Sequence, residues 1–585
     1  MRSSHRNLFA TRWSLSKPVC GGAEPAAALT PTEGAVAAGQ NVAGTVSFAF
    51  AAPISMTTAE VVAAAPSQRM PVAPAPAAPP APPTFSPRVV IGLLGMLLTS
   101  LAAGLNEHVT EVAMMDVRGA LSIGHDEGTW LTALFEATNV AAMAFAPWCA
   151  VTLSLRRFTI GAALMFALLG LLCPFAPNVE TLAVLRALQG LAGGCLPPML
   201  MTAALRYLPP NIKLYGLASY ALTATFGPNL GTPLAAFWTE YVNWRMVFWQ
   251  VVPLCLVSTA AIAYGLPQDP QRLERFRSFN WVGLLTGFPA ISMLVIGLYQ
   301  GDRLDWLNSP LICVMLGGGG LLFCLFLLNE WSHPLPFFKL RMLAQRNFTH
   351  SLITLAGVLV VLLGVAVIPS DYLIEVRGYR PLQIAPLALV VALPQLIALP
   401  VTAAILNIER VDCRWVLGLG LTLVAASCAL GSFMTSDWVR ENFYLLQALL
   451  TIGEPMAVIP LLMQVTTNLP PTEGPFASAM FNMVKGFAAA VGTGLVTGLG
   501  TAREHYHSVM LVDRLGSEPL TASQAGDRTG TFADLAGRIH EQAVVLMSAD
   551  LYLVMAAITT ALVLLIPIVP VRVRPPRATA PTTSR

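Results

Sequence analysis

Long apolar runs separated by short polar stretches recur along the chain between residues 88 and 571. A helix needs about 20 apolar residues to cross the roughly 30 Å hydrocarbon core of a bilayer. Because irregular backbone cannot satisfy its polar groups in hydrocarbon, the pattern predicts an all-α polytopic membrane protein with about fourteen transmembrane helices. The fourteen predicted segments are 88–110, 129–152, 158–176, 180–205, 214–238, 244–266, 279–300, 309–330, 347–370, 382–406, 414–434, 441–468, 476–500 and 549–571.

The composition agrees with this interpretation. Hydrophobic residues make up 55% of the chain and charged residues 11%, whereas a soluble domain carries about 25% charged residues. The net charge of +3 is too small to indicate nucleic-acid binding. The nine cysteines form no Cys-x-x-Cys pair and no metal-ligand spacing, so we expect small packing residues and neither metal nor cofactor.

The first 87 residues differ from the rest. They are rich in Ala, Pro, Ser and Thr, a composition that buries too little apolar surface to fold, so we expect a disordered arm. Our hypothesis is that translation starts at Met56 or Met70.

Lys and Arg predict the orientation, because cytoplasmic loops carry an excess of these residues. With the N-terminus inside, 22 of the 34 basic residues are cytoplasmic and nine lie outside. An even number of helices places the tail 572–585 inside as well. The connection 501–548 is then a long external loop.

Two carboxylates lie at the end of the first predicted helix. Glu107 and Glu111 are four residues apart and share a helix face. Two close, partly desolvated carboxylates tend to share a proton, which predicts a proton-carrying site. Alternatively, the helix ends near Leu105 and both residues lie in a solvated loop.

The fourth predicted helix contains Arg186, followed by an apolar run. A charge inside a membrane costs roughly 2.5–3.5 kcal/mol, so this arginine must find a partner or line a cavity, unless it snorkels to the cytoplasmic face. Gly190 and Gly194 form a Gly-x-x-x-Gly step that lets another helix approach closely.

Other polar residues are scattered through the predicted helices. The fifth helix contains Gly227, Pro228 and Gly231, where proline removes a backbone hydrogen bond and favours a bend. No catalytic grouping or nucleotide-binding loop is visible, so we expect no enzyme activity. The remaining candidates, which we assign to a substrate path, are Glu136, Asn139, Glu454 and Lys485.

These residues together resemble a known family, the 14-helix drug:proton antiporters of the major facilitator superfamily, of the EmrB/QacA type. The resemblance extends over residues 88–571. The blocks that carry it are Arg186–Gly190, Gly227-Pro228-x-x-Gly231, Trp244-Arg245 with Phe248 and Pro253, Arg346-Asn347-Phe348, and Asn482-x-x-Lys485.

The resemblance implies a major facilitator fold, with six-helix bundles at 88–266 and 347–571 and two additional helices within 279–330. It implies that Arg186 takes part in proton coupling. It also implies partners: a periplasmic adaptor protein and an outer-membrane channel, in addition to the small-molecule substrate, protons and the inner-membrane bilayer.

The sequence departs from the family pattern in two places. In the first helix, Asn106 and Glu111 replace the family's Asp and Asn, and Asp116 replaces its closing Pro. The loop at 147–157, normally Gly-rich with an Asp, keeps only its basic end, so the cytoplasmic latch of the family is expected to be altered. Our hypothesis is that Glu107 or Glu111 takes over from the missing Asp.

The function expected from these features is export of amphiphilic or aromatic small molecules, driven by the proton-motive force. Two alternatives stay open. One is a proton-coupled importer of an organic anion, which the fifth-helix motif disfavours. The other is a non-transporting membrane sensor or scaffold, which the altered motifs allow.

Overall fold

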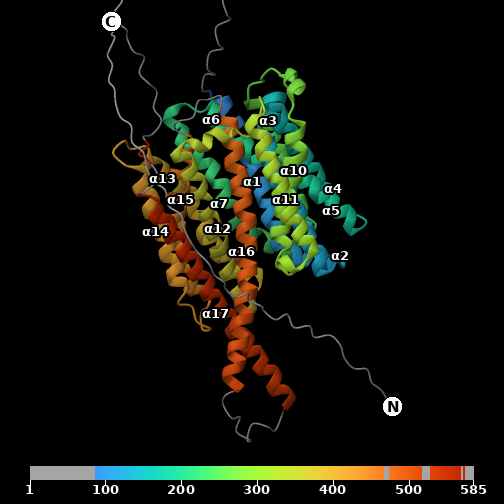
Figure 1. Cartoon of the computed structure of the whole chain (residues 1–585), viewed down its shortest axis with the longest axis vertical. Coiled ribbons are helices and arrows are strands. Elements are labelled where there is room, and N and C mark those ends of the chain that lie inside the picture. The colour runs from blue at the N-terminus through green and yellow to red at the C-terminus, as the bar shows by residue number, and fades with distance from the viewer. Residues whose placement is uncertain (1–85, 467–472, 517–527, 568–570, 574–585) are drawn as a thin grey trace, which may run out of the picture. The chain divides into compact units, whose positions relative to one another are not determined.

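Helices form every regular element in the described part of the chain. The computed structural model describes residues 86–466, 473–516, 528–567 and 571–573, so most of the predicted disordered arm lies outside the described residues. Contacts group residues 81–585 into one compact unit. The helices (Figure 1) are α1 (Pro87–Val112), α2 (Met114–Leu121), α3 (His125–Leu153), α4 (Leu155–Leu172), α5 (Val179–Gly194), α6 (Leu196–Tyr207), α7 (Lys213–Phe237), α8 (Met246–Trp249), α9 (Val251–Gly265), α10 (Trp281–Gln300), α11 (Pro310–Ser332), α12 (Arg346–Glu375), α13 (Pro381–Leu406), α14 (Cys413–Gly431), α15 (Arg440–Thr466), α16 (Gly474–Gly516) and α17 (Arg528–Leu565).

Among the described residues, thirteen helical segments are long and apolar enough to cross a membrane. The predicted segment missing from these thirteen is the fifth, 214–238, which corresponds to α7, whose mean hydropathy is lowered by its Gly, Pro, Asn and Thr residues. Two predicted segments each contain two consecutive helices: α5 and α6 meet at Cys195 just before Pro197 and Pro198, and α8 and α9 meet at Gln250. The prediction of an all-helical membrane protein is confirmed.

The helices pack in a first set, α1 to α9, and a second set, α12 to α17, with the pair α10 and α11 beside them. In the first set α3 packs on α5, and α1 packs on α7 and α9; in the second set α15 packs on α13 and α14, and α12 on α16 and α17. The two sets meet where α7 packs on α13 and where α16 packs on α3. The additional helices α10 and α11 pair with each other, and α10 also contacts α3 and α16.

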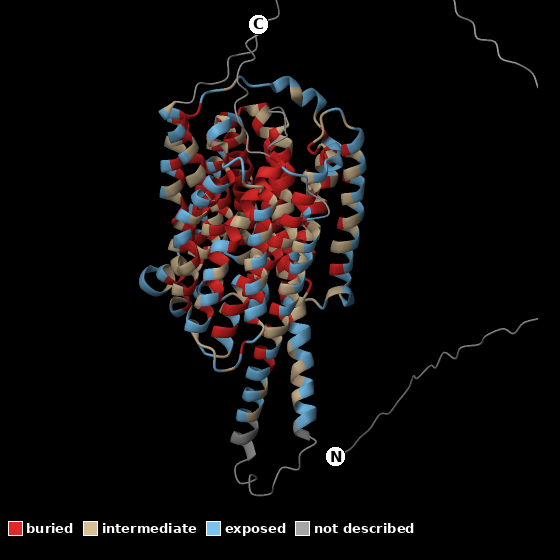
Figure 2. Cartoon of the chain, turned by 90° about the vertical axis from the view of Figure 1, so that its left-hand side faces the viewer, coloured by how far each residue is buried: buried red, intermediate tan, exposed pale blue. Residues whose placement is uncertain are grey.

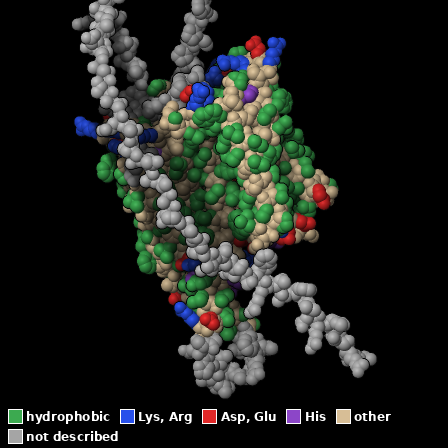
Figure 3. Space-filling model, in the orientation of Figure 1, with side chains coloured by type: hydrophobic (Ala, Val, Ile, Leu, Met, Phe, Trp, Pro, Cys, Tyr) green, Lys and Arg blue, Asp and Glu red, His purple; other side chains and the backbone are tan. Residues whose placement is uncertain are grey.

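Burial follows the same arrangement. Buried residues concentrate where the helices face one another, and exposed residues lie on their outer sides (Figure 2). Hydrophobic side chains cover much of the visible flank of the bundle, while charged side chains gather toward its ends (Figure 3). An apolar flank with charged ends is the surface expected of a protein embedded in a bilayer.

The segment 501–548, predicted as a loop, is largely helical. Helix α16 continues to Gly516 and α17 begins at Arg528, and both extend past the neighbouring helices (Figures 1 and 2). The loop prediction was wrong because charged residues end an apolar run without ending a helix, since Arg and Glu are good helix formers. Asp550 of α17 joins the two helices by accepting hydrogen bonds from Arg503 at 2.8 Å and His507 at 2.7 Å.

The chain that follows α9 lies against the α3–α4 loop, and the chain that follows α17 lies against the α13–α14 loop. In the first set, we call residues 268–272 the first strap. Gln268 Nε2 donates a hydrogen bond to Ser154 Oγ at 3.2 Å, and the backbone N–H of Arg272 donates to the carbonyl of Thr152 at 2.9 Å. The α3–α4 loop is therefore held by a hydroxyl and a backbone carbonyl.

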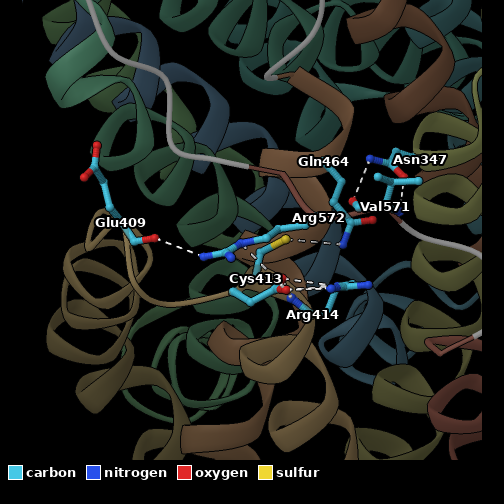
Figure 4. A network of polar contacts seen from close by, with 8 residues as sticks. Asn347, Glu409, Cys413, Arg414, Gln464, Val571 and Arg572 are labelled. Carbon is cyan, nitrogen blue, oxygen red and sulfur yellow. Dashed lines mark hydrogen bonds and ion pairs between the residues drawn. The ribbon is translucent and has the colours of Figure 1, made fainter.

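In the second set, we call residues 571–573 the second strap (Figure 4). Asn347 forms two hydrogen bonds with the backbone of Val571, the first residue of this strap, at 3.0 and 2.8 Å. Arg572 donates to the carbonyl of Glu409 at 3.3 Å, and its Nε lies 4.0 Å from the Asp412 carboxylate. The α13–α14 loop is therefore held partly by charge.

Candidate functional site

A cavity of about 50 Å³ lies where α1, α3, α5, α6, α7 and α16 converge. Four of the predicted polar residues line it: Glu107, Glu136, Asn139 and Lys485. Lys485 comes from the second set of helices, and the other three come from the first. Binding sites for drug-sized molecules occupy about 300–1,000 Å³, so this arrangement admits water and excludes a larger ligand.

Asn139 connects the two carboxylates of the cavity. Its Nδ2 lies 3.3 Å from Glu107 Oε2 and 3.3 Å from Glu136 Oε2. Glu136 and Asn139 are buried, whereas the Glu107 side chain is 27% exposed. An amide that donates to two carboxylates holds them near each other without neutralising either.

His108 extends this polar group along α1. Its ring nitrogens lie 3.9 Å from Glu107 Oε1 and 3.5 Å from Glu111 Oε2. Because α1 continues to Val112, both glutamates are helical, which excludes a loop beginning at Leu105. Glu111 is half exposed and is not part of the cavity lining.

Arg186 is buried beside the cavity and does not snorkel. Its Nη1 donates to Gln189 Oε1 at 2.9 Å and to Asn106 Oδ1 at 3.3 Å, and its guanidinium lies 4.0 Å from the ring centre of Phe135. No carboxylate of the described residues forms an ion pair with it, although Glu136 is among the nearby charges. Asn106, which stands where the resembled family has an Asp, therefore contacts Arg186 through a neutral amide.

Gly190 and Gly194 lie against the backbone of α3. A Cβ at Gly190 would overlap the carbonyl oxygen of Phe135, and one at Gly194 would overlap that of Asn139. Both overlaps involve backbone atoms, which cannot rotate away. The Gly-x-x-x-Gly step thus allows α5 and α3 to approach at the level of the cavity.

The fifth-helix motif lies against α1. Helix α7 is continuous across Pro228, and a Cβ at Gly231 would lie 2.7 Å from the Cβ of His108. Gly227 has more room, since its nearest neighbour would be the carbonyl carbon of Gly104 at 3.9 Å. Gly231 is therefore the residue of this motif that permits close approach to the acidic end of α1.

Glu454 does not join the other candidates. It lies in α15 and accepts a hydrogen bond at 3.0 Å from Gln395 Nε2 in α13, and it is not part of the cavity lining.

Sequence reasoning missed four contact residues. His108 stands between the two predicted glutamates, and Gln189 lies one helical turn after Arg186, so their spacing was a usable signal. Gln395 is a lone amide in an apolar run, which also marks it. Nothing in the sequence distinguishes Phe135 from other aromatic residues. Among the described residues, no group of His, Cys, Asp and Glu is arranged to hold a metal ion.

The family model described as Major Facilitator Superfamily matches residues 89–492. The chain belongs to this superfamily. It is therefore a multi-pass membrane transporter, and the family predicted from the motifs is confirmed.

Curated members of the superfamily resemble the chain over most of their length. The multidrug export protein EmrB of Escherichia coli K12 is 23% identical over 73% of this chain and 83% of its own length. The colistin resistance protein EmrB of Acinetobacter baumannii is 24% identical over 68% of this chain and 78% of its own. An uncharacterized MFS-type transporter of Bacillus subtilis, YhcA, is 23% identical over 72% and 79%.

Solved structures agree on the fold. The proton:xylose symporter XylE matches with a TM-score of 0.51 and 11% identity, over 84% of this chain and 98% of its own. The human organic anion transporter MFSD10 matches with a TM-score of 0.50 and 12% identity, over 81% of this chain and 100% of its own.

Proposed function

We propose that the protein is a drug:proton antiporter that exports amphiphilic or aromatic small molecules across the inner membrane, driven by the proton-motive force. The observation that carries this proposal is the central cavity, where Glu107 and Glu136 from the first set of helices meet Lys485 from the second. The names of the EmrB relatives, a multidrug export protein and a colistin resistance protein, support export of drugs.

Antiport requires that substrate and protons compete for one site, and in this proposal the cavity is that site. When α16 separates from α3, the space between Lys485 and the two glutamates opens toward the size of a drug-binding site. A substrate then displaces protons from the carboxylates, and protons displace the substrate on the opposite side. One proton charge moving through 100 mV supplies about 2.3 kcal/mol, which suffices for a tenfold gradient of substrate.

Arg186 acts in this scheme as the fixed positive charge next to the titrating groups. Its hydrogen bonds to Gln189 and Asn106 hold it in place without neutralising it. The field of an unpaired guanidinium favours loss of a proton from a neighbouring carboxyl when the substrate arrives. We assign the role of proton carrier to Glu107 and Glu111, with His108 between them.

The orientation belongs to the proposal as well. Both termini and the two straps face the cytoplasm, and the ends of α16 and α17 face outward, as the distribution of Lys and Arg indicates. Among the described residues, these ends of α16 and α17 extend past the neighbouring helices, on the side where a periplasmic adaptor protein would lie, which in turn would connect to an outer-membrane channel.

The test is proton movement in proteoliposomes of purified protein with an imposed pH gradient and an internal pH dye. A panel of cationic, neutral and anionic aromatic compounds is added in turn. For at least one compound we expect protons to move opposite to the compound. Replacing Glu136→Gln or Arg186→Gln should lower the coupled flux by about tenfold or more, since each removes a charged hydrogen-bonding group.

Gly317→Ala provides the matched control. A Cβ at this position of α11 meets no atom within 4 Å, so the variant should transport like the wild type. Movement of protons and an anionic compound in the same direction would replace the proposal with symport. Absence of flux for the whole panel would favour a sensor or scaffold.

A further inference from the structure

Glu454 and Gln395 form an isolated polar pair inside the second set of helices. Glu454 is 6% exposed and Gln395 is fully buried. Their one hydrogen bond runs from Gln395 Nε2 to Glu454 Oε2 at 3.0 Å. The Gln395 Oε1 atom, also buried, has no hydrogen-bond partner among the described residues.

Among the described residues, no positive charge pairs with the buried Glu454 carboxylate, whose one hydrogen bond comes from the neutral amide of Gln395. The helices packed on α15 are α7, α12, α13, α14 and α16. Helix α13 contains no titratable residue. On the other four helices, four titratable side chains are engaged elsewhere: Tyr220 with Asn482, His350 with Gln464, Arg414 with Asp412, and Lys485 at the central cavity.

An ionised carboxylate that is buried without a cation is strongly disfavoured. A protonated one completes this pair. Its O–H donates to the unpartnered Gln395 Oε1, while Gln395 Nε2–H stays on the other carboxyl oxygen, so that both polar groups are satisfied. We propose that Glu454, with Gln395 as its partner, is a proton-binding site separate from the central cavity and occupied in this conformation.

The site lies in a contact between helices that depends on side-chain hydrogen bonds. Pro394 has no N–H to offer the carbonyl of Val390 one turn earlier, and Thr451 Oγ1 lies 3.2 Å from that oxygen while it also donates at 2.8 Å to the carbonyl of Gln447 on its own helix. Thr451 and Glu454 are one helical turn apart on α15, so both side chains contact α13. Since α13 also packs on α7, loss of the proton would weaken a contact next to the meeting of the two sets of helices.

The role of this site in transport rests on the proposed antiport, but proton binding is measured without transport. Infrared difference spectroscopy of the purified protein in lipid, from pH ~5 to pH ~9, detects the C=O stretch of a protonated carboxyl well above the ordinary pKa of Glu. We expect a carboxylic-acid band at neutral pH that disappears in Glu454→Gln. In Gln395→Leu the band should remain and shift to higher frequency, because its hydrogen bond is lost.

Glu330→Gln is the control with another buried glutamate. The Glu330 carboxylate accepts hydrogen bonds from Asn280 at 2.7 Å and from the backbone of Phe338 at 2.9 Å, so its replacement should leave the Glu454 band in place. Identical spectra of the wild type and Glu454→Gln would overturn the proposal. If Glu454→Gln does not fold, an unchanged band in Gln395→Leu overturns it instead. Failure of the antiport assay leaves these spectra unaffected.

Discussion

The two straps perform the same task with different chemistry. The first strap lies on the α3–α4 loop, and the second strap lies on the α13–α14 loop. The second strap meets a loop with an acidic residue, and Asp412 accepts hydrogen bonds from the Arg414 guanidinium and backbone and lies near Arg572. Around the first strap, Arg156 donates to the carbonyl of Ala263 instead.

The difference shows which contacts hold such a loop when it contains no carboxylate. The α3–α4 loop contains no acid in residues 147–157. Its turn is made by Ser154, which is buried and has φ of 86° and ψ of 129°, a conformation that favours glycine. Backbone carbonyls, a hydroxyl and a strained residue thus replace the charge. The altered cytoplasmic latch of the resembled family stays a prediction.

The largest effect is expected when Asp412 of the α13–α14 loop is replaced. Asp412→Ala removes the cap of α14 and the Arg414 contacts and should lower stability by about 2 kcal/mol. Asp269→Ala is the matched change within the first strap, where the pair with Arg206 is partly exposed. Partly exposed pairs of this kind contribute about 1 kcal/mol or less. Thermal unfolding followed by tryptophan fluorescence compares the two, and equal losses would contradict the contrast.

A smaller effect of opposite sign is expected at Ser154. Ser154→Gly relieves backbone strain of about 1–3 kcal/mol and loses the Gln268 hydrogen bond of about 1 kcal/mol. The net result should be a gain of about 1 kcal/mol. Ser154→Ala keeps the strain and loses the bond, so it should be destabilising. A gain in both variants, or in neither, would show that the backbone of this loop is not strained.

The smallest effect concerns pH at the second strap. Partial burial raises the pKa of Asp412, but the hydrogen bonds from Arg414 and the charge of Arg572 outweigh it and hold the pKa below its usual 3.8. The carboxylate therefore contributes its full stability above that value and loses it as the pH falls through the lower, folded-state pKa.

The comparison of wild type with Asp412→Asn isolates this group from other acids. The two unfolding midpoints should differ at neutral pH and approach each other in acid below the usual value. A constant difference across the whole range would mean that Asp412 keeps its charge or does not contribute through it.

The candidate site shows what a sequence can and cannot place. Charges inside apolar runs marked Glu107, Glu136, Arg186 and Lys485, because such residues are too costly to keep without a role. Their spacing along single helices carries no information about which helices face each other. The structure places three of the four on one cavity, gives Arg186 amide partners beside it, and sends Glu454 to a different contact.

By itself, the sequence determined the helical membrane fold, the family and the residues worth suspecting. Each of these follows from a local property: the length of an apolar run, the cost of a buried charge or the order of a motif. Tertiary structure alone decided that α16 and α17 extend beyond the bilayer-spanning length, that His108 and Asn139 join the carboxylates, and that Gln395 faces Glu454. Those contacts depend on the rotation and register of helices far apart in the chain, which packing fixes and the pattern along one helix does not contain.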